Sequence, residues 1–338
     1  MIRFRGLLFL SFILAGVFLP AQLHAQKELE KSYRGDWAEV PPVKPKFEGD
    51  LTPQECAEAT AWLNGVVEIL HKMPLLEDPQ GFRVIPHVSA QPQDIDDGSA
   101  SGRPTHIAGL VQLNLASFEN TDGGIVSNAN DSAAQIQVVV NDLVPIFGAA
   151  SIQTGSEESG DFYYGMPHSD GTIHDLPVYN RWVVIQNGDT PLFAQVTRGD
   201  YLKFAIRAAE KALADMQKRV AANVQESTDE QNRAALDLAK NHVVELKQQQ
   251  DEMSSDEAQM PATLATTDEN GAVRFASPDD ASATPVVTIN PALFDSSGSR
   301  AAPRILAIKF DTDDADWPDI LETIDAQLDW QSLEALVQ

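Results

Sequence analysis

The sequence predicts an α+β protein, with a body built on a mostly antiparallel sheet, flanking helices and an inserted long antiparallel helical hairpin. Residues 201–260 contain neither Gly nor Pro, although the 338-residue chain has 20 of each. Apolar residues recur there at alternating spacings of three and four, which is typical of helices that pack along one another. Before and after this stretch, short runs rich in Val, Ile and Leu are bounded by turn residues, as strands are.

The first 25 residues have the pattern of a secretory signal peptide. Arg3 and Arg5 precede an apolar run over 6–19, and the small residue Ala25 stands before Gln26. A charged segment, a short apolar segment and a small residue at the cleavage point define such signals. We therefore expect cleavage between Ala25 and Gln26 and an exported protein, periplasmic or extracellular. No other apolar run is long enough for a spanning helix, so no membrane span is expected in the mature chain.

Residues 26–50 contain a Pro-rich run and are expected to form an extended arm, and the body begins after them. The first part of the body, residues 51–197, opens with a helix. Thr52 is followed by Pro53 at the first helical position and by Glu55 three residues after the Thr, which is a capping box with Pro at N1. Cys56 falls on the apolar face of this helix, so a buried and inert thiol is expected.

Strands should follow this helix, separated by polar loops. Runs rich in Val, Ile and Leu occur over 81–87, 107–118, 134–140 and 178–186. The last run is joined through Asn187, Gly188 and Asp189 to a further strand over 192–196, because these residues favour a tight hairpin turn. Polar stretches cover 91–104, 120–132 and 154–161. Long loops of this composition are either functional or poorly ordered, and the sequence leaves both alternatives open.

Residues 198–260 are predicted to form the helical hairpin, with one apolar seam on each helix. The first seam consists of Leu202, Ile206, Ala209, Leu213, Met216 and Val220. The second seam consists of Leu236, Ala239, Val243, Leu246, Gln250 and Met253. Between them, Ser227 and Glu230 have the spacing of a capping box, which favours a second helix start over one continuous helix. The continuous helix remains the alternative.

The second part of the body, residues 261–338, is expected to return to the sheet. Strand-like runs occur over 285–289 and 305–310. Apolar residues at helical spacing after Trp317 predict one or two C-terminal helices. Asp329 has the side chain of an N-cap for a final turn that begins at Trp330.

Composition excludes some classes of protein. The chain carries a formal net charge of −26 and has no basic stripe on which a nucleic-acid backbone could dock, so no nucleic-acid partner is expected. Cys56 is the only cysteine, so no intrachain disulfide can form. Sequence motifs of serine hydrolases, zinc proteases and phosphate-binding loops are absent, which favours a non-enzymatic protein.

Two segments have side chains suited to a divalent cation, the only kind of cofactor that the sequence suggests. Around Gly171 stand His168, Asp170, His174 and Asp175, and imidazoles with carboxylates are ligands of Zn²⁺. The alternative is an ordinary solvated loop, since the spacing matches no established zinc motif.

The second segment has the spacing of a twelve-residue calcium loop. Asp311, Asp313, Asp319 and Glu322 occupy its positions one, three, nine and twelve. Ala315 replaces a ligand and Asp316 replaces the required Gly. The alternative interpretation is an acidic loop at the positive end of the C-terminal helix.

The function that these observations favour is binding or assembly in the bacterial envelope, with the helical hairpin contacting a protein partner or a second copy of the chain. The hairpin seam is narrow, and Gln250 interrupts it, so a partner helix could complete it. The alternative is a secreted hydrolase or metal-dependent enzyme that uses the segment 168–175. The sequence identifies no catalytic residue and no substrate.

Overall fold

The computed structural model describes residues 32–93, 106–121, 124–148, 163–222, 229–265, 273–277, 280, 283–294, 298–312, 323 and 326–337. Within these ranges the chain is α+β with a mostly antiparallel sheet, which confirms that part of the predicted fold class. The expected signal peptide, the capping box at Ser227 and the residues around Trp317 lie outside the described residues.

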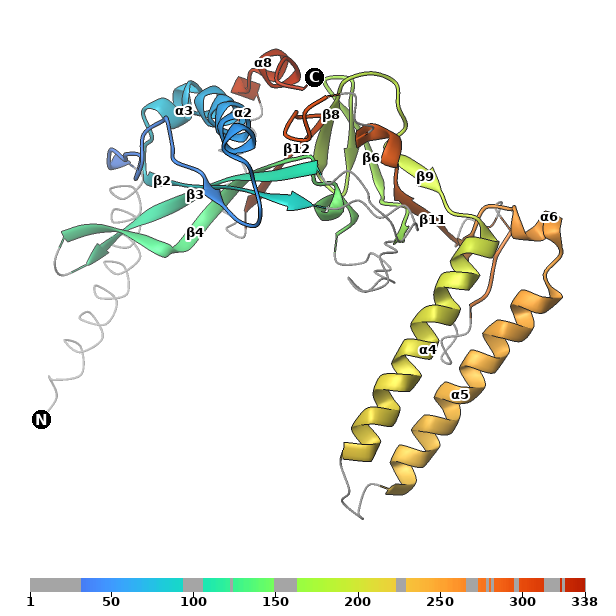
Figure 1. Cartoon of the computed structure of the whole chain (residues 1–338). Coiled ribbons are helices and arrows are strands. Elements are labelled where there is room, and N and C mark those ends of the chain that lie inside the picture. The colour runs from blue at the N-terminus through green and yellow to red at the C-terminus, as the bar shows by residue number, and fades with distance from the viewer. Residues whose placement is uncertain are drawn as a thin grey trace, which may run out of the picture.

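Figure 1 shows how the strands and helices of the described residues are arranged. The strands are β1 (Lys46–Phe47), β2 (Phe82–Gln93), β3 (His106–Thr121), β4 (Gly124–Val140), β5 (Tyr164–Gly165), β6 (Ser169–Ile173), β7 (Leu176–Tyr179), β8 (Trp182–Gln186), β9 (Phe193–Gln195), β10 (Thr263–Leu264), β11 (Thr284–Ile289) and β12 (Ile305–Thr312). The α-helices are α2 (Pro53–His71), α3 (Pro74–Glu77), α4 (Arg198–Ala222), α5 (Asp229–Glu252), α6 (Ser255–Ala258) and α8 (Trp330–Glu334), with 3₁₀ helices η1 (Val144–Phe147) and η3 (Pro291–Phe294).

Eight strands form the large sheet, in the order β1-β2-β3-β4-β12-β8-β7-β6. Only β1 and β2 pair in parallel, and the other neighbours in this sheet are antiparallel. β12 lies between β4 and β8, so a strand that follows α5 in the chain pairs with strands that precede α4. Residues on both sides of α4 and α5 therefore share one sheet.

The prediction of a loop over 120–132 is wrong for most of these residues, which belong to the strands β3 and β4. β3 and β4 continue as a hairpin in which Thr121 pairs with Gly124 and Phe118 with Ser127. Figure 1 shows this end of the hairpin extending beyond the helices that cover the sheet. Polar residues are compatible with strand here because the backbone hydrogen bonds of the pairing do not depend on side-chain character.

One face of the large sheet is covered by α2, α3 and α8 (Figure 1). The capping box predicted for α2 is confirmed, because the Thr52 side chain accepts the Glu55 N–H and the Glu55 carboxylate accepts the Thr52 N–H. Cys56 is half-buried, which is less than the sequence predicted. The ring of Trp62 lies directly on Gly109 of β3, where a Cβ atom would be 2.2 Å from the ring. Gly109 therefore sets how closely α2 approaches the sheet.

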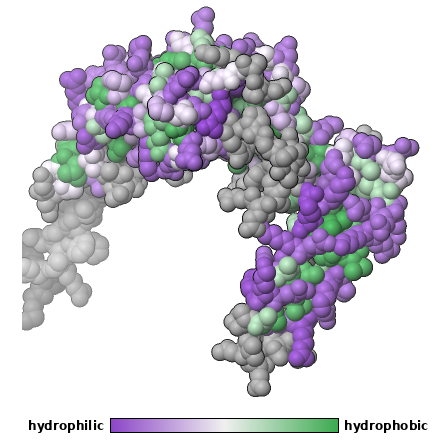
Figure 2. Space-filling view, in the orientation of Figure 1, coloured by the Kyte–Doolittle hydropathy of each residue, from purple (hydrophilic) through white to green (hydrophobic). Residues whose placement is uncertain are grey.

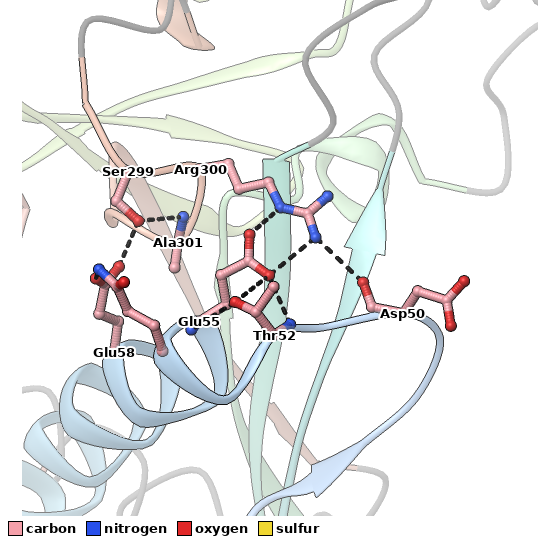
Figure 3. Close-up of polar contacts among 8 residues, drawn as sticks. Asp50, Thr52, Glu55, Glu58, Ser299, Arg300 and Ala301 are labelled. Carbon is pink, nitrogen blue, oxygen red and sulfur yellow. Dashed lines mark hydrogen bonds and ion pairs between the residues drawn. The ribbon is translucent and has the colours of Figure 1, made fainter.

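The start of α2 is joined to the segment before β12 by an ion pair (Figure 3). The Arg300 guanidinium donates to both carboxylate oxygens of Glu55, with 3.0 Å between Nη2 and Oε2, and also to the Asp50 carbonyl. Ser299 donates to the Glu58 carboxylate, and the Trp62 indole donates to the Ala301 carbonyl at 2.8 Å. Hydrogen bonds from Arg300 and from Thr52 lower the pKa of Glu55 to about 2.

We expect the substitution Glu55→Gln to reduce the free energy of unfolding at neutral pH by about 1–3 kcal/mol, since hydrogen bonds to charged groups contribute about that much. The pKa of Glu55 is about 2 in the folded protein, against an ordinary value of 4.5 for a glutamate. The difference between wild type and variant should therefore be complete above the unfolded pKa and disappear as the pH falls from 4.5 towards 2. Urea unfolding at several pH values measures it.

The matched control is Glu68→Gln, at an exposed position of the same helix. Its effect should stay within about 0.5 kcal/mol. Equal effects at the two positions would show that the Arg300 ion pair contributes nothing to stability.

Asn141, at the end of β4, joins three strands through its side chain. Its Nδ2 donates to the carbonyls of Ile107 and Ala302, both at 3.0 Å, and its Oδ1 accepts the N–H groups of Arg304 and Ile305. The residue is 1% exposed and has a φ of 57°, in the left-handed region that Asn tolerates better than most residues. The ends of β3, β4 and β12 are therefore fixed relative to one another by one amide.

His106, the first residue of β3, is buried beside Asn141. Its Nε2 donates to the Asn141 carbonyl at 2.7 Å, and its ring stacks on Phe294 with 4.2 Å between the ring centroids. Burial lowers the pKa of His106 to about 4, because a charged imidazole would lose its hydration there. His106 is therefore neutral in the folded protein at neutral pH.

Acidification should destabilise the folded protein through His106. The unfolded chain takes up a proton near the ordinary histidine pKa of 6.5, whereas the folded protein does so only near 4, so stability is lost as the pH falls through this window. One such proton contributes a slope of up to about 1.4 kcal/mol per pH unit. In the variant His106→Gln, we expect the unfolding free energy to depend less steeply on pH between these two values. Parallel pH profiles of wild type and variant would contradict the assignment.

A second, smaller sheet packs against part of the opposite face of the large sheet. Its order is β10-β11-β5, and β9 also pairs with β11. A separate apolar cluster lies between the sheets, in which Phe147 and Tyr164 stack with 4.0 Å between the ring centroids. The buried residues of this cluster include members of β4, β8 and β12, and Leu110 of β3 packs against its edge.

α4 and α5 lie side by side and extend away from the two sheets (Figure 1). We call this pair of helices the arm. At its base, the Arg198 N–H donates to the Met260 carbonyl and the Ala262 N–H donates to the Val196 carbonyl, both at 2.8 Å. The chain therefore leaves the small sheet and returns to it at adjacent points. No helix in the described ranges combines the length and apolar character that crossing a membrane requires.

Candidate functional site

The segment 168–175, predicted as a metal-binding loop, forms the strand β6 and the turn into β7 at the edge of the large sheet. His168 precedes β6 and lies near Asp170, with 3.5 Å between Nε2 and Oδ1. His174 and Asp175 form the turn at the other end of the strand, with φ values of 51° and 65°. The structure therefore brings His168 and Asp170 together, and residues 171–173 of β6 separate them from His174 and Asp175.

Asp170 and His174 each contact residues outside this segment. The second Asp170 carboxylate oxygen accepts the Arg181 N–H at 2.7 Å, and the His174 ring contacts Trp330 of α8 with 5.4 Å between the ring centroids. Among the described residues, no group of three or more His, Cys, Asp or Glu side chains is arranged to hold a metal ion. Metal binding by His168, Asp170, His174 and Asp175 stays a prediction from the sequence.

The predicted calcium loop is described only at its first residue. Asp311 belongs to β12, where its carboxylate lies 2.7 Å from Lys309 Nζ and 3.3 Å from Arg181 Nη2. Asp313, Asp319 and Glu322 lie outside the described residues. Calcium binding by this segment also stays a prediction.

The arm consists of the two longest helices of the described structure, of 25 and 24 residues, and its apolar seams are most buried toward the base. Leu202 and Ile206 of α4 form a small core with Leu246 of α5 near the base. An ion pair between Lys247 Nζ and Glu210 Oε1, at 2.6 Å, crosses from α5 to α4 just beyond this core. Val243 of α5, one turn farther out, is 8% exposed, and the seam residues beyond it are half-buried. They are Ala209, Leu213, Met216 and Val220 of α4, and Leu236 and Ala239 of α5.

Two exposed apolar residues of α5 lie outside the seam. Leu238 is 71% exposed and Val244 is 62% exposed. Spacings of three and four place their chain neighbours Ala239 and Val243 in the seam and leave Leu238 and Val244 out of it. The signal that could have found them is a second apolar residue beside a seam position. Figure 2 shows hydrophobic residues in a strip along the arm, flanked by hydrophilic ones.

No family model, curated protein or solved structure matches the chain. The arm, its half-buried seam and its exposed apolar residues therefore have to be interpreted from their own geometry.

Leu246 and Leu238, on the same helix, should respond differently to truncation. Leu246 is 2% exposed within the core at the base of the arm, so Leu246→Ala should destabilise the arm by about 2–4 kcal/mol. Leu238→Ala should change stability by no more than about 0.5 kcal/mol, because its side chain is already in water. Amide hydrogen exchange in α4 and α5 measures both effects. Equal loss of protection in the two variants would contradict the placement of these leucines.

Proposed function

We propose that the protein is a non-enzymatic binding or assembly protein of the bacterial envelope, and that the arm is its partner-binding surface. In this proposal residues 198–260 are an inserted antiparallel helical hairpin, and residues 51–197 and 261–338 together form the body that supports it. The occupant is a helical segment of a partner protein. It lies along the two helices of the arm and completes a larger helical bundle.

The attachment of the arm supports its interpretation as an insertion. The chain leaves at Val196 and returns at Ala262, which are hydrogen-bonded neighbours. Arg198 reinforces this base, because its Nη2 donates to the Ala276 carbonyl at 2.9 Å and its guanidinium lies over the Phe275 ring. A segment with adjacent ends can project from a body without separating the strands on either side of it.

The observation that carries the proposal is the apolar surface that two helices alone leave uncovered. A pair of helices has only one mutual face, and beyond the buried Val243 that face is half-buried. Leu238 and Val244 add exposed apolar side chains on the two flanks of the α5 seam, because six residues turn an α-helix by about 240°. The half-buried seam gives the projecting arm an apolar strip, and exposed apolar patches mark protein-interaction sites. Placement in the envelope is supported by the signal-peptide pattern of the first 25 residues.

The test is a pull-down from envelope extract with the mature chain and with a variant in which residues 207–252 are replaced by a short linker. A partner that the mature chain captures and the trimmed variant does not would support the proposal. Circular dichroism of the trimmed variant verifies that the body still folds. Capture by both baits, or by neither, would contradict a partner site on the arm.

A second pair of variants separates the apolar surface from the arm as a whole. The double variant Leu238→Ser, Val244→Ser should bind the partner at least about tenfold more weakly, since each buried apolar side chain contributes about 1.5–3 kcal/mol. The matched control is Val126→Ser, an exposed apolar position of β4 in the body. It should leave binding unchanged.

A further inference from the structure

A hollow of about 340 Å³ lies on the face of the large sheet opposite α2, beside the small sheet. Its floor contains Gln112 of β3 and Gln137 of β4, which are directly opposite each other in the strand register. Leu110 and Trp182 contribute apolar lining, and Asp142 lies at its edge beyond the end of β4. The volume is at the lower end of the range for small-molecule sites. The hollow is distinct from the arm and from the segment 168–175.

The two glutamines on the floor offer hydrogen-bond acceptors. Gln112 Nε2 donates to Asn114 Oδ1 at 2.8 Å, and Gln137 Nε2 donates to Gln135 Oε1 at 2.9 Å. Each amide is therefore oriented by a neighbour on its own strand. Neither amide oxygen of Gln112 and Gln137 accepts a hydrogen bond from another described residue. A ligand with hydroxyl or N–H donors can use both oxygens.

Asp142 provides a carboxylate that is held in place through one oxygen. Oδ1 accepts the Val144 N–H at 3.0 Å and lies 3.5 Å from Gln93 Nε2. Oδ2 receives no hydrogen bond from the described residues. Burial raises the pKa of the Asp142 carboxyl, which reflects a charge that has lost hydration without gaining a cation. A ligand ammonium group would supply that cation.

The charges around the hollow exclude anions and favour one positive group. None of the described residues that line it is Lys or Arg. The other acid of the lining, Glu48, is paired with Lys46 at 2.7 Å, so Asp142 is the acid without a cationic partner. Trp182 adds an indole ring, which is a favourable neighbour for an organic ammonium. The chain as a whole, with its net charge of −26, attracts cations.

We propose that this hollow binds a hydroxylated primary amine of about the size of an amino sugar. The ammonium group lies against Asp142 Oδ2, and the hydroxyl groups donate to the amide oxygens of Gln112 and Gln137.

The test compares an amino sugar with the same sugar acetylated on its amine. Calorimetric titration of the full mature chain is done with glucosamine and with N-acetylglucosamine in near-neutral buffer, because acid would neutralise the Asp142 carboxylate, whose pKa is raised. Glucosamine should bind at least about tenfold more tightly, because only its amine can pair with a carboxylate. Absence of binding heat with glucosamine, or equal affinity for the two sugars, would overturn the proposal.

Variants of residues in the hollow test whether glucosamine binds there. Asp142→Asn keeps the shape of the side chain and removes its charge, and it should weaken glucosamine binding about tenfold. Gln137→Met should weaken it about threefold by removing one acceptor, and it decides the matter if Asp142→Asn does not fold. The control is Asp189→Asn, an exposed acid in the turn after β8, which should leave the affinity unchanged. Unchanged affinity in the folded Asp142 variant, or equal loss in the control, would overturn the assignment.

Discussion

One buried side chain, Asn141, holds the ends of β3, β4 and β12 together in the large sheet through its hydrogen bonds. β12 comes from a part of the chain more than 160 residues beyond β4, as the separation of 163 between Arg304 and Asn141 shows. Asn141 pairs with the backbone of both β3 and β12 at the point where these strands start, and it does so without contact with water. A buried amide with every polar atom engaged specifies one arrangement, because any other register would leave those atoms unpaired.

The two faces of the large sheet then acquire different roles. On the α2 side, Trp62 fits against Gly109 and the face is closed by a continuous apolar core. On the other side, the small sheet covers the strands β4, β12 and β8 and leaves polar residues of β3 and β4 half-exposed. The glutamines of this uncovered region are compatible with the fold because their amides bond to neighbours on the same strand. A sheet with one closed and one partly open face has room for a ligand beside a rigid floor.

The parts of the fold that the sequence predicted are the parts that depend on local contacts. Thr52, Pro53 and Glu55 predicted the start of α2 because a capping box lies within four residues. Asp329 accepts the Ser332 N–H, as its predicted N-cap role requires, for the same local reason. The α+β class followed from the helical spacing over 201–260 and from the short runs rich in Val, Ile and Leu. The β3–β4 extension was missed because residues such as Ser127 are polar, and strand pairing there is independent of an apolar pattern.

The candidate sites were less accessible to sequence reasoning. His168 and His174 are close in the chain, yet an extended strand separates them, and the sequence pattern predicted no strand there. The hollow unites Glu48, Gln112, Gln137, Asp142 and Trp182, which come from five separate positions along the chain. Only the register of β3 with β4 brings the two glutamines together. Pairing between distant strands is a tertiary property, and no local spacing encodes it.

The ion pair between Glu55 and Arg300 has a consequence for the order in which the chain folds. Its partners are separated by 245 residues, and β12 can take its place between β4 and β8 only after the arm and the small sheet have been synthesised. Contacts between distant residues form slowly because closing a long loop costs chain entropy, whereas helices form from local contacts within microseconds. The helices of the arm can therefore form early, while the large sheet stays open at the site of β12 until the end. Until then, β4 and β8 each have one edge without a paired strand, and these edges need protection from pairing with other chains.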